Sequence, residues 1–247
     1  MKTAYFRFYE ELNDFLPPEK RKIKFEHPFF CRASVKDIIE SLGVPHTEID
    51  LILVNGKSVD FSYIINDKDE ISVYPVFESF DISEVQHLRP QPLREPKFIV
   101  DVHLGRLAKN LRMLGFDTLY KNNTKDNELI DISQKERRTI ITKNREILKR
   151  NNVTHGCWIR SKTPEDNVIE IIKRFDLKNQ IREFTRCLGC NLLLKKTEKE
   201  KIADKIPAKV ELRHNEFFIC NHCNKVYWKG SHYNKMSALV QKILRAL

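Results

Sequence analysis

The stretch FIVDVHLGRLAKNLRMLGFDTLY, residues 98–120, decides the fold of the middle of the chain. Its first three residues are apolar and predict a short buried strand that ends at Asp101. Apolar residues then recur at helical spacing over residues 104–114, and Gly115 closes the predicted helix. Residues 118–120 predict a second strand, so strand and helix alternate from the start of this region.

The same alternation continues downstream. The predicted elements are a helix that begins at Asp126, a strand over residues 139–142, a helix over 145–150, a strand over 157–159 and a helix from Pro164 to about Phe175. Strands that alternate with helices favour a mostly parallel sheet with helices packed against it. We therefore expect an α/β domain over residues 97–180.

Residues 1–80 predict a separate α+β domain. The expected elements are strands over residues 4–9, 23–26, 51–54 and 71–75, and a helix that Ser34 caps together with Asp37 and that ends at Gly43. Asn55-Gly56 marks a tight turn after the third strand. This ββαββ order is a β-grasp, the ubiquitin-like fold. Three prolines among polar residues over 81–96 indicate a linker to the next domain.

The stretch LILVNGKSVDFSYIINDKDEISVYPVF, residues 51–77, also resembles the ubiquitin-like sulfur carriers of thiamine and molybdopterin synthesis. That resemblance implies a flexible Gly-Gly tail whose carboxylate is activated. Here the chain continues through Glu78-Ser79-Phe80-Asp81, with no diglycine at this point. The carrier chemistry is therefore excluded, and a protein partner or a scaffolding role is left for the domain.

Four of the six cysteines form two C-x-x-C pairs, which predicts a metal site within residues 181–247. Each pair bends into a turn that aims two sulfurs at one point, and four thiolates close a tetrahedral structural zinc site. The proposed ligands are Cys187, Cys190, Cys220 and Cys223. Redox pairs or buried thiols are the alternative, and His222 is interpreted as a bystander. The isolated Cys31 and Cys157 are expected to be ordinary core residues.

Charge is distributed unevenly along the chain, whose net charge is +10. Residues 1–80 carry 10 Lys and Arg against 14 Asp and Glu, whereas residues 181–247 carry 14 against 6. A basic C-terminal region suits a polyanion such as nucleic acid, although a solubilising lysine surface explains it as well. No apolar run reaches the roughly 20 residues of a membrane span, and no signal-peptide pattern opens the chain, so we expect a cytoplasmic protein without a membrane partner.

The segment KVYWKGSHYNKM, residues 225–236, mixes aromatic and basic side chains directly after the second cysteine pair. Such a surface can stack on bases while its cations hold phosphate. The candidate nucleic-acid-binding residues here are Tyr227, Trp228, Lys229, His232 and Lys235. Alternatively, the two aromatic rings merely cover the small zinc core, and both roles are compatible.

Three polar residues of the predicted α/β domain stand at the end of a strand or at the start of a helix. Ligands of such sheets bind beyond the carboxyl ends of the strands. Asp101 follows the first strand, Asp126 opens a helix, and Asn144 follows the strand over residues 139–142. Oxygen ligands that converge there suit Mg²⁺ or Mn²⁺. By spacing alone the signal is weak, because an Asp at a helix start is more often a cap than a metal ligand.

Several motifs in order resemble the Mut-seven C-terminal RNase domain family. They are the stretch over residues 98–120, DNELIDIS from residue 126, RTIITKN from residue 138, the two cysteine pairs and VYWKGSHYNKM. The resemblance covers about residues 97–240, and the ubiquitin-like domain that often precedes the family's RNase domain accounts for 1–80. It implies a PIN-like nuclease fold, followed by a four-cysteine zinc ribbon, that cleaves RNA with a divalent metal.

The resemblance also suggests roles for individual residues. Asp101 matches the family's first-strand aspartate, and Asp126 matches its second acidic position, with Glu128 as a nearby reserve. The third position, usually the aspartate of a Thr-Arg-Asp triplet, is Asn144 here, which lacks the negative charge. Lys143 and Arg145 are neighbouring candidates for phosphate contacts, and Asp117 is a structural candidate.

Three functions therefore stay open from the sequence. The first is a hydrolase, namely a Mg²⁺- or Mn²⁺-dependent ribonuclease with a structural zinc ion. The second is an RNA-binding module that has the fold but lost the chemistry, because Asn144 weakens the metal site. The third is an adaptor that binds a protein partner through its β-grasp domain.

Overall fold

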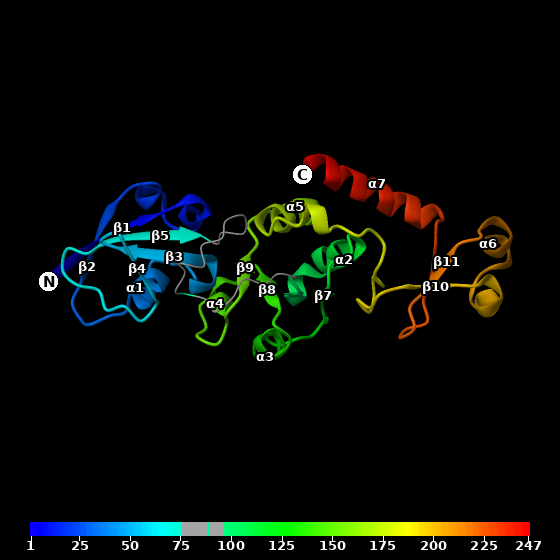
Figure 1. Cartoon of the computed structure of the whole chain (residues 1–247), viewed down its shortest axis with the longest axis horizontal. Coiled ribbons are helices and arrows are strands. Elements are labelled where there is room, and N and C mark those ends of the chain that lie inside the picture. The colour runs from blue at the N-terminus through cyan, green and yellow to red at the C-terminus, as the bar shows by residue number, and fades with distance from the viewer. Residues whose placement is uncertain (76–87, 89–95) are drawn as a thin grey trace. The chain divides into compact units, whose positions relative to one another are not determined.

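A computed structural model describes residues 1–75, 88 and 96–247 (Figure 1). The chain forms two compact units. The first comprises residues 1–95 and 126–158, and the second comprises 96–125 and 159–247. Most of the predicted linker over residues 81–96 lies outside the described residues, and the division into domains at 1–80, 97–180 and 181–247 stays a prediction.

The N-terminal part of the first unit has the predicted β-grasp topology. Its strands are β1 (Lys2–Phe8), β2 (Phe25–Phe29), β3 (Ile49–Val54), β4 (Lys57–Val59) and β5 (Glu70–Pro75), with helix α1 (Val35–Ser41) and the 3-10 turns η1 (Glu10–Phe15), η2 (Pro18–Lys20) and η3 (His46–Glu48). The strand order is β2-β1-β5-β3-β4, in which β1 and β5 are parallel and the other neighbours antiparallel. Helix α1 and the inward side chains of β1, β3 and β5 form one apolar core.

Local capping fixes helix α1 as the sequence predicts. The Ser34 hydroxyl accepts the backbone N–H of Asp37 at 3.1 Å, and the Asp37 carboxylate accepts the backbone N–H of Ser34 at 3.3 Å. This reciprocal capping box satisfies two N–H groups that have no partner within the helix. At the other end Gly43 has φ +98°, a conformation that costs glycine little.

The remainder of the first unit alternates strand and helix. It comprises α3 (Asp126–Glu136), β8 (Thr139–Thr142), α4 (Arg145–Leu148) and β9 (Gly156–Trp158). β8 and β9 are parallel, and Thr142 lies opposite Trp158. The predicted helix that begins at Asp126 and the predicted strand over residues 139–142 are both confirmed.

The two isolated cysteines of the first unit differ in burial. Cys157 on β9 is buried, as predicted for a core residue. Cys31, which follows β2, is exposed, so the expectation of a core residue is wrong there. The physical reason is its position just beyond the end of a strand, where the chain turns through solvent before α1 begins.

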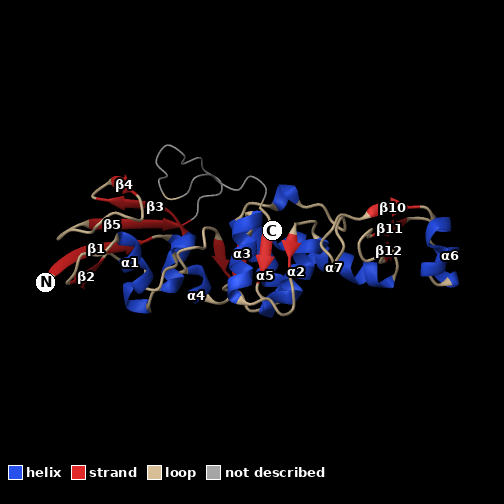
Figure 2. Ribbon diagram, turned by 90° about the horizontal axis from the view of Figure 1, so that it is seen from below, coloured by secondary structure: helices blue, strands red, loops and turns tan. Residues whose placement is uncertain are grey.

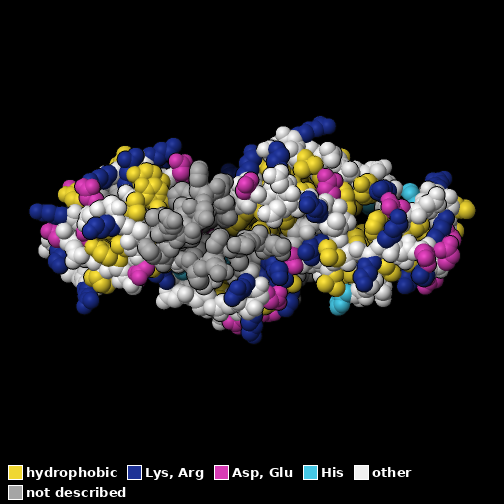
Figure 3. All heavy atoms as spheres, viewed as in Figure 1, with side chains coloured by type: hydrophobic (Ala, Val, Ile, Leu, Met, Phe, Trp, Pro, Cys, Tyr) yellow, Lys and Arg dark blue, Asp and Glu magenta, His cyan; other side chains and the backbone are white. Residues whose placement is uncertain are grey.

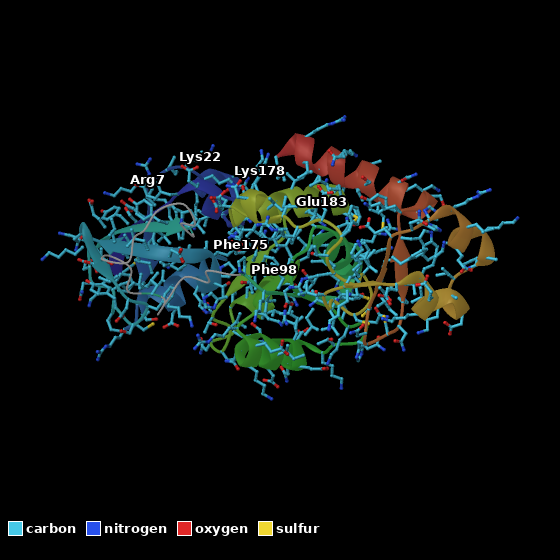
Figure 4. The ribbon with its side chains drawn as sticks, turned by 45° about the vertical axis from the view of Figure 1, so that its right-hand side comes forward. Arg7, Lys22, Phe98, Phe175, Lys178 and Glu183 are labelled. Carbon is cyan, nitrogen blue, oxygen red and sulfur yellow. The ribbon has the colours of Figure 1, made fainter. Side chains whose placement is uncertain are left out.

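The second unit opens with the stretch on which the fold prediction is based. Its elements up to residue 180 are β6 (Phe98–Val100), η4 (Val102–Leu104), α2 (Gly105–Met113), β7 (Thr118–Leu119), α5 (Pro164–Arg174) and η5 (Lys178–Gln180). β6 and β7 are parallel. Phe98 is fully buried, and its ring meets the ring of Phe175 edge-on with centroids 5.6 Å apart (Figure 4). Gly115 ends α2 with φ +96°, as its position in the sequence predicts.

The C-terminal part of the second unit is a small antiparallel sheet followed by a helix (Figure 2). Its elements are β10 (Lys195–Thr197), η6 (Lys199–Lys205), α6 (Ala208–Arg213), β11 (Phe217–Ile219), β12 (Val226–Trp228) and α7 (Ser231–Ala246), with strand order β10-β11-β12. Ile202, Ile206 and Phe217 form its core. Of the helices in the described residues, none has the length and apolar character for crossing a bilayer.

Candidate functional site

Four cysteine side chains from two separate parts of the sequence meet in one place. The Sγ atoms of Cys187, Cys190, Cys220 and Cys223 all lie within 4.8 Å of one another, and those of Cys187 and Cys223 are 3.6 Å apart. Thiolates at about 2.3 Å from a tetrahedral zinc ion stand roughly 3.8 Å apart. The cluster therefore fits a metal ion such as zinc, and the predicted ligand set is brought together. His222 is exposed and does not belong to this cluster.

The two cysteine pairs form the same backbone turn. In each pair the N–H of the first cysteine donates to the carbonyl five residues later, at 2.8 Å for Cys187 and 3.0 Å for Cys220. The residue after each pair, Asn191 or Asn224, has a positive φ of 70° or 58° and donates its N–H back to the first cysteine's carbonyl. Asparagine tolerates this left-handed conformation better than most residues. The signal in the sequence is C-x-x-C-N, and the two asparagines were not among the predicted site residues.

A tyrosine hydroxyl completes the surroundings of Cys187. The Tyr227 hydroxyl lies 3.2 Å from the Cys187 Sγ and accepts the backbone N–H of Leu188 at 3.2 Å. Burial raises the pKa of the Cys187 thiol, but hydrogen bonds from Tyr227 and from backbone N–H groups outweigh burial and lower the pKa to about 6. Cys187 is therefore prepared as a thiolate, the form that binds metals. Tyr227 thus contacts the cysteine cluster, and its part in RNA binding stays a prediction.

The other predicted nucleic-acid-binding residues of this region lie on β12 and around α7. Trp228 is half-buried and packs against the core of Ile202, Ile206 and Phe217. Lys229 forms an ion pair with Glu216 at 2.9 Å. His232 and Lys235 are exposed and stand three residues apart on α7, so they share one side of that helix. On the face seen in Figure 3, Lys and Arg side chains lie among Asp and Glu side chains.

The first cysteine turn is bound to helix α2 and the segment that follows it. The guanidinium of Arg112, which is only 4% exposed, donates to the carbonyls of Leu188 at 3.0 Å, Gly189 at 2.8 Å and Thr118 at 2.8 Å. This anchor joins residues far apart in the sequence, and the planar fork of arginine suits several carbonyls at once.

Asn191 adds a second connection between the same two segments. Its side-chain oxygen accepts the backbone N–H of Thr118 at 2.9 Å, and its side-chain nitrogen donates to Asp117 at 2.8 Å. Asp117 therefore has the structural role that the sequence suggested. The cysteine cluster and the end of α2 therefore form one hydrogen-bonded block.

Asp101 lies where the sequence predicts, directly after β6. Its side chain is 6% exposed, and its Oδ1 accepts the backbone N–H of His103 at 3.0 Å. This is the bond of an N-cap to the 3-10 turn η4. The capping role that the sequence left open is thus present at Asp101.

Asp126 and Glu128 lie on the first turn of α3 and are exposed. The Asp126 carboxylate is 3.4 Å from the guanidinium of Arg150, which also donates to the Asn127 side chain at 2.6 Å. A carboxylate proposed as a cation ligand therefore already faces a positive charge. Sequence reasoning missed Arg150.

Asn144 caps the short helix α4. Its side-chain oxygen accepts the backbone N–H of Glu146 at 3.0 Å, and its own N–H donates to the hydroxyl of Thr142 at 2.9 Å. The residues on either side both contact Trp158. The indole N–H of Trp158 donates to the carbonyl of Lys143 at 3.3 Å, and the Arg145 guanidinium lies 3.8 Å from the centroid of the Trp158 ring.

The candidate catalytic residues divide between the two compact units. Asp101 belongs to the second unit, whereas Asp126, Glu128 and Asn144 belong to the first. Each of Asp101, Asp126 and Asn144 has a local partner that keeps its side chain in place. Their convergence on a divalent cation stays a prediction.

Comparison with known families identifies the class of protein that the fold and the cysteine cluster belong to. The model of the Mut7-C RNAse domain matches residues 96–240, and the model of the Mut7-C ubiquitin domain matches residues 1–81. The first match alone covers more than half of the chain. The chain therefore belongs to the Mut7-C RNAse domain family and carries the associated ubiquitin-like domain at its N-terminal side. Neither the curated proteins nor the solved structures contain a match.

Proposed function

We propose that this protein is a metal-dependent ribonuclease that hydrolyses RNA phosphodiester bonds. The observation that carries the proposal is the match of residues 96–240 to an RNAse domain. The order of elements in the region supports a PIN-like α/β fold, because parallel strand pairs alternate with helices. In such folds, ligands bind beyond the carboxyl ends of the strands.

The proposed catalytic residues are oxygen donors. Asp101 and Asp126 supply carboxylates, Glu128 is a reserve carboxylate, and Asn144 supplies an amide oxygen. This donor set fits Mg²⁺ or Mn²⁺, which prefer oxygen ligands. When bound, such a cation supplies charge stabilisation at the phosphate and acidifies water. Asp101 suits the role because it directly follows β6, at the carboxyl end of a strand where ligands bind in such folds.

Binding of RNA is assigned to basic and aromatic side chains of both units. Lys143 and Arg145 flank Asn144. The other five residues all follow the second cysteine pair: Tyr227, Trp228, Lys229, His232 and Lys235. We infer that the cysteine cluster holds zinc in a structural role, since four thiolates leave no open coordination position. The metal then keeps the ribbon folded and supplies no chemistry.

Cleavage of a labelled structured RNA in the presence of Mn²⁺ tests the proposal. The wild-type chain should produce fragments, and Asp101→Asn should abolish them, because the carboxylate charge is lost while the side-chain oxygen that caps η4 stays. Equal product from Asp101→Asn would identify a contaminating nuclease. Asn144→Asp should raise the rate, because aspartate caps a helix as well as asparagine and adds a negative charge.

A second candidate function, RNA binding without cleavage, is favoured by two contacts. The side-chain oxygen of Asn144 is engaged by the N–H of Glu146, and the carboxylate of Asp126 faces Arg150. Both contacts weaken a cation site. If the chain binds RNA with a steep salt dependence in EDTA, but does not cleave it with Mn²⁺, this function holds. Zinc analysis must confirm that the chelator left the structural site loaded. If RNA does not bind even at low salt, an adaptor role through the ubiquitin-like domain is the function left.

A further inference from the structure

A run of buried residues in the ubiquitin-like domain includes polar side chains that contact another segment of the first unit. Residues 44–50 are all buried, although His46, Thr47, Glu48 and Asp50 are polar. Buried polar groups are costly unless they are hydrogen-bonded. Three of these side chains find partners outside the ubiquitin-like domain, in the segment over residues 126–158 of the same compact unit.

Successive residues of this run contact the segment over residues 126–158. His46 Nε2 lies 2.8 Å from the carbonyl of Val153, while its Nδ1 lies 2.6 Å from the carboxylate of Glu40. The Thr47 hydroxyl lies 3.4 Å from the carbonyl of Leu148. Beside them, Lys36 on α1 donates to the side chain of Asn151 at 2.7 Å. The ubiquitin-like domain is thereby attached to the loops around β9.

The strongest of these contacts is made to Trp158 at the end of β9. The Glu48 carboxylate, which has no exposed surface, accepts the backbone N–H of Trp158 at 2.7 Å. The Trp158 ring packs against the apolar core of the ubiquitin-like domain, where its centroid is 4.9 Å from that of Phe15. A hydrogen bond out of contact with water is electrostatically stronger than the same bond in water.

Trp158 in turn holds the segment that carries Asn144. Its indole N–H donates to the carbonyl of Lys143, and its ring lies under the guanidinium of Arg145, which also lies 5.0 Å from the centroid of the Phe15 ring. Asn144 stands between these two residues and caps α4. A chain of contacts thus runs from the core of the ubiquitin-like domain through Trp158 to both neighbours of Asn144.

We propose that the ubiquitin-like domain positions the segment over residues 142–146 through the contacts of Glu48 and Phe15 with Trp158. Glu48 is a positioning residue in this view. The catalytic consequence rests on the proposed ribonuclease function, because Asn144 is one of its oxygen donors. An interaction domain that is merely tethered would have no effect on this segment.

The test is hydrogen exchange of the backbone amides of residues 142–146 in the full chain, measured without RNA or divalent cations. Glu48→Ala should speed exchange of the Asn144 and Glu146 amides about tenfold, the effect of losing one good hydrogen bond. Glu48→Gln keeps an acceptor and should restore most of the protection. Glu70→Ala is the matched control, because Glu70 lies in the same domain and its side chain pairs with Lys24 on the surface; it should exchange like the wild type.

Trp158→Phe isolates the second part of the chain of contacts. It keeps a ring against Phe15 but removes the indole N–H, so exchange of the same amides should rise although the melting temperature changes little. This variant also serves if Glu48→Ala does not fold. Wild-type exchange rates of residues 142–146 in folded Glu48→Ala, or in Trp158→Phe, would overturn the proposal.

Cleavage assays with Mn²⁺ separate this inference from the proposed function. If both hold, Glu48→Ala should lower kcat/KM about tenfold, because the segment carries Asn144 together with Lys143 and Arg145, and Glu48→Gln should be intermediate. Faster exchange in Glu48→Ala, combined with no cleavage by the wild type, would support the positioning role and refute the nuclease assignment. A wild-type kcat/KM in Glu48→Ala, combined with cleavage by the wild type, would refute a role of this positioning in catalysis.

Discussion

The hydroxyl of Tyr227 lies 3.2 Å from the Sγ of Cys187, and this contact links the last strand of the C-terminal sheet to the first cysteine turn. The ordinary pKa of the thiol is 9.0, and the hydrogen bonds at Cys187 overcome burial to lower it to about 6. Because the folded-state pKa is lowered, the thiolate stabilises the metal-free fold fully above about pH 9. That contribution is lost as the pH falls towards 6.

Replacing Tyr227 with Phe should make the metal site more sensitive to acid. Without the hydroxyl, the pKa of Cys187 rises, so protons displace zinc at a higher pH. One hydrogen bond of about 1 kcal/mol corresponds to roughly 0.7 pH unit. Zinc release, followed with a colorimetric chelator across a pH titration, measures the shift. Tyr233→Phe removes a hydroxyl from α7 and should leave the midpoint unchanged; equal midpoints for all three proteins would contradict the role of Tyr227.

Loss of one ligand should empty the cysteine cluster. Cys220 is fully buried at the site, so Cys220→Ser should abolish stoichiometric zinc binding and unfold the small sheet that depends on it. Metal analysis and a lower melting temperature are the measurements. Cys31 is exposed and distant from the cluster in sequence, and Cys31→Ser should keep one zinc ion per chain. One zinc ion per chain in Cys220→Ser would refute the ligand assignment.

Replacing Arg112 with Lys should destabilise the chain by about 2 kcal/mol, although the charge is kept. A lysine ammonium cannot reach the carbonyls of Leu188, Gly189 and Thr118 together, and buried acceptors are then left without a donor. Urea unfolding at a fixed zinc concentration measures the loss. Arg106→Lys on the exposed side of the same helix should change stability by less than about 0.5 kcal/mol. Equal stability of the two variants would mean that the anchor contributes little.

Arg150 should weaken cation binding at Asp126. The pair is partly exposed, so its removal in Arg150→Gln should raise the apparent Mn²⁺ affinity only about two- to fivefold. Calorimetric titration with Mn²⁺ gives the affinity directly. Lys149→Gln is the matched control, since Lys149 pairs with Glu146 rather than with Asp126. An affinity that falls in Arg150→Gln would count against Asp126 as a ligand.

The exposed side of α7 should contribute to RNA binding through charge alone. Helix α7 contains no acidic residue, and Lys235, Lys242 and Arg245 are all exposed. Changing Lys235 and Lys242 to Gln should reduce the slope of log K against log salt by about 0.7 for each lysine that contacts single-stranded RNA. The same change at Lys2 and Lys57 of the ubiquitin-like domain should leave the slope unaltered. An unchanged slope in the α7 variant would exclude this helix from the interface.

Local signals in the sequence were sufficient for much of the fold. Ser34 with Asp37 marked the start of α1, and Gly43 and Gly115 marked two helix ends, because capping bonds and left-handed turns involve neighbours in the chain. The cysteine pairs were equally readable, since each pair forms its turn from adjacent residues. The family resemblance based on the same motifs is confirmed.

Helix α7 was missed although its pattern was present. Met236, Val240, Ile243 and Leu244 recur at helical spacing and lie on the buried or half-buried side. The aromatic and basic residues of 225–236 indicate a binding surface but do not by themselves predict a helix. The signal for the helix is the spacing of the apolar residues. The spacing of apolar residues is a stronger signal of a helix than the types of the residues.

Contacts between distant segments were beyond reach from one sequence. Glu48 and Trp158 are 110 residues apart, and nothing in either neighbourhood indicates the other. In the sequence, Arg112 is an ordinary polar residue of an amphipathic helix. Two of its carbonyl partners, Leu188 and Gly189, lie 76 and 77 residues further along the chain and cannot be predicted from its neighbours. Such pairings are set by tertiary packing and leave no local trace.

The buried run over residues 44–50 has a practical consequence for anyone who separates the N-terminal domain from the rest of the chain. An excised fragment would present the Glu48 carboxylate and the side of Phe15 to water, together with backbone and side-chain groups whose partners were removed. The folded state of the fragment would be less stable, and its uncovered apolar surface would favour self-association. Screens for binding partners that use such a fragment would report nonspecific binding to a surface that is covered in the intact polypeptide.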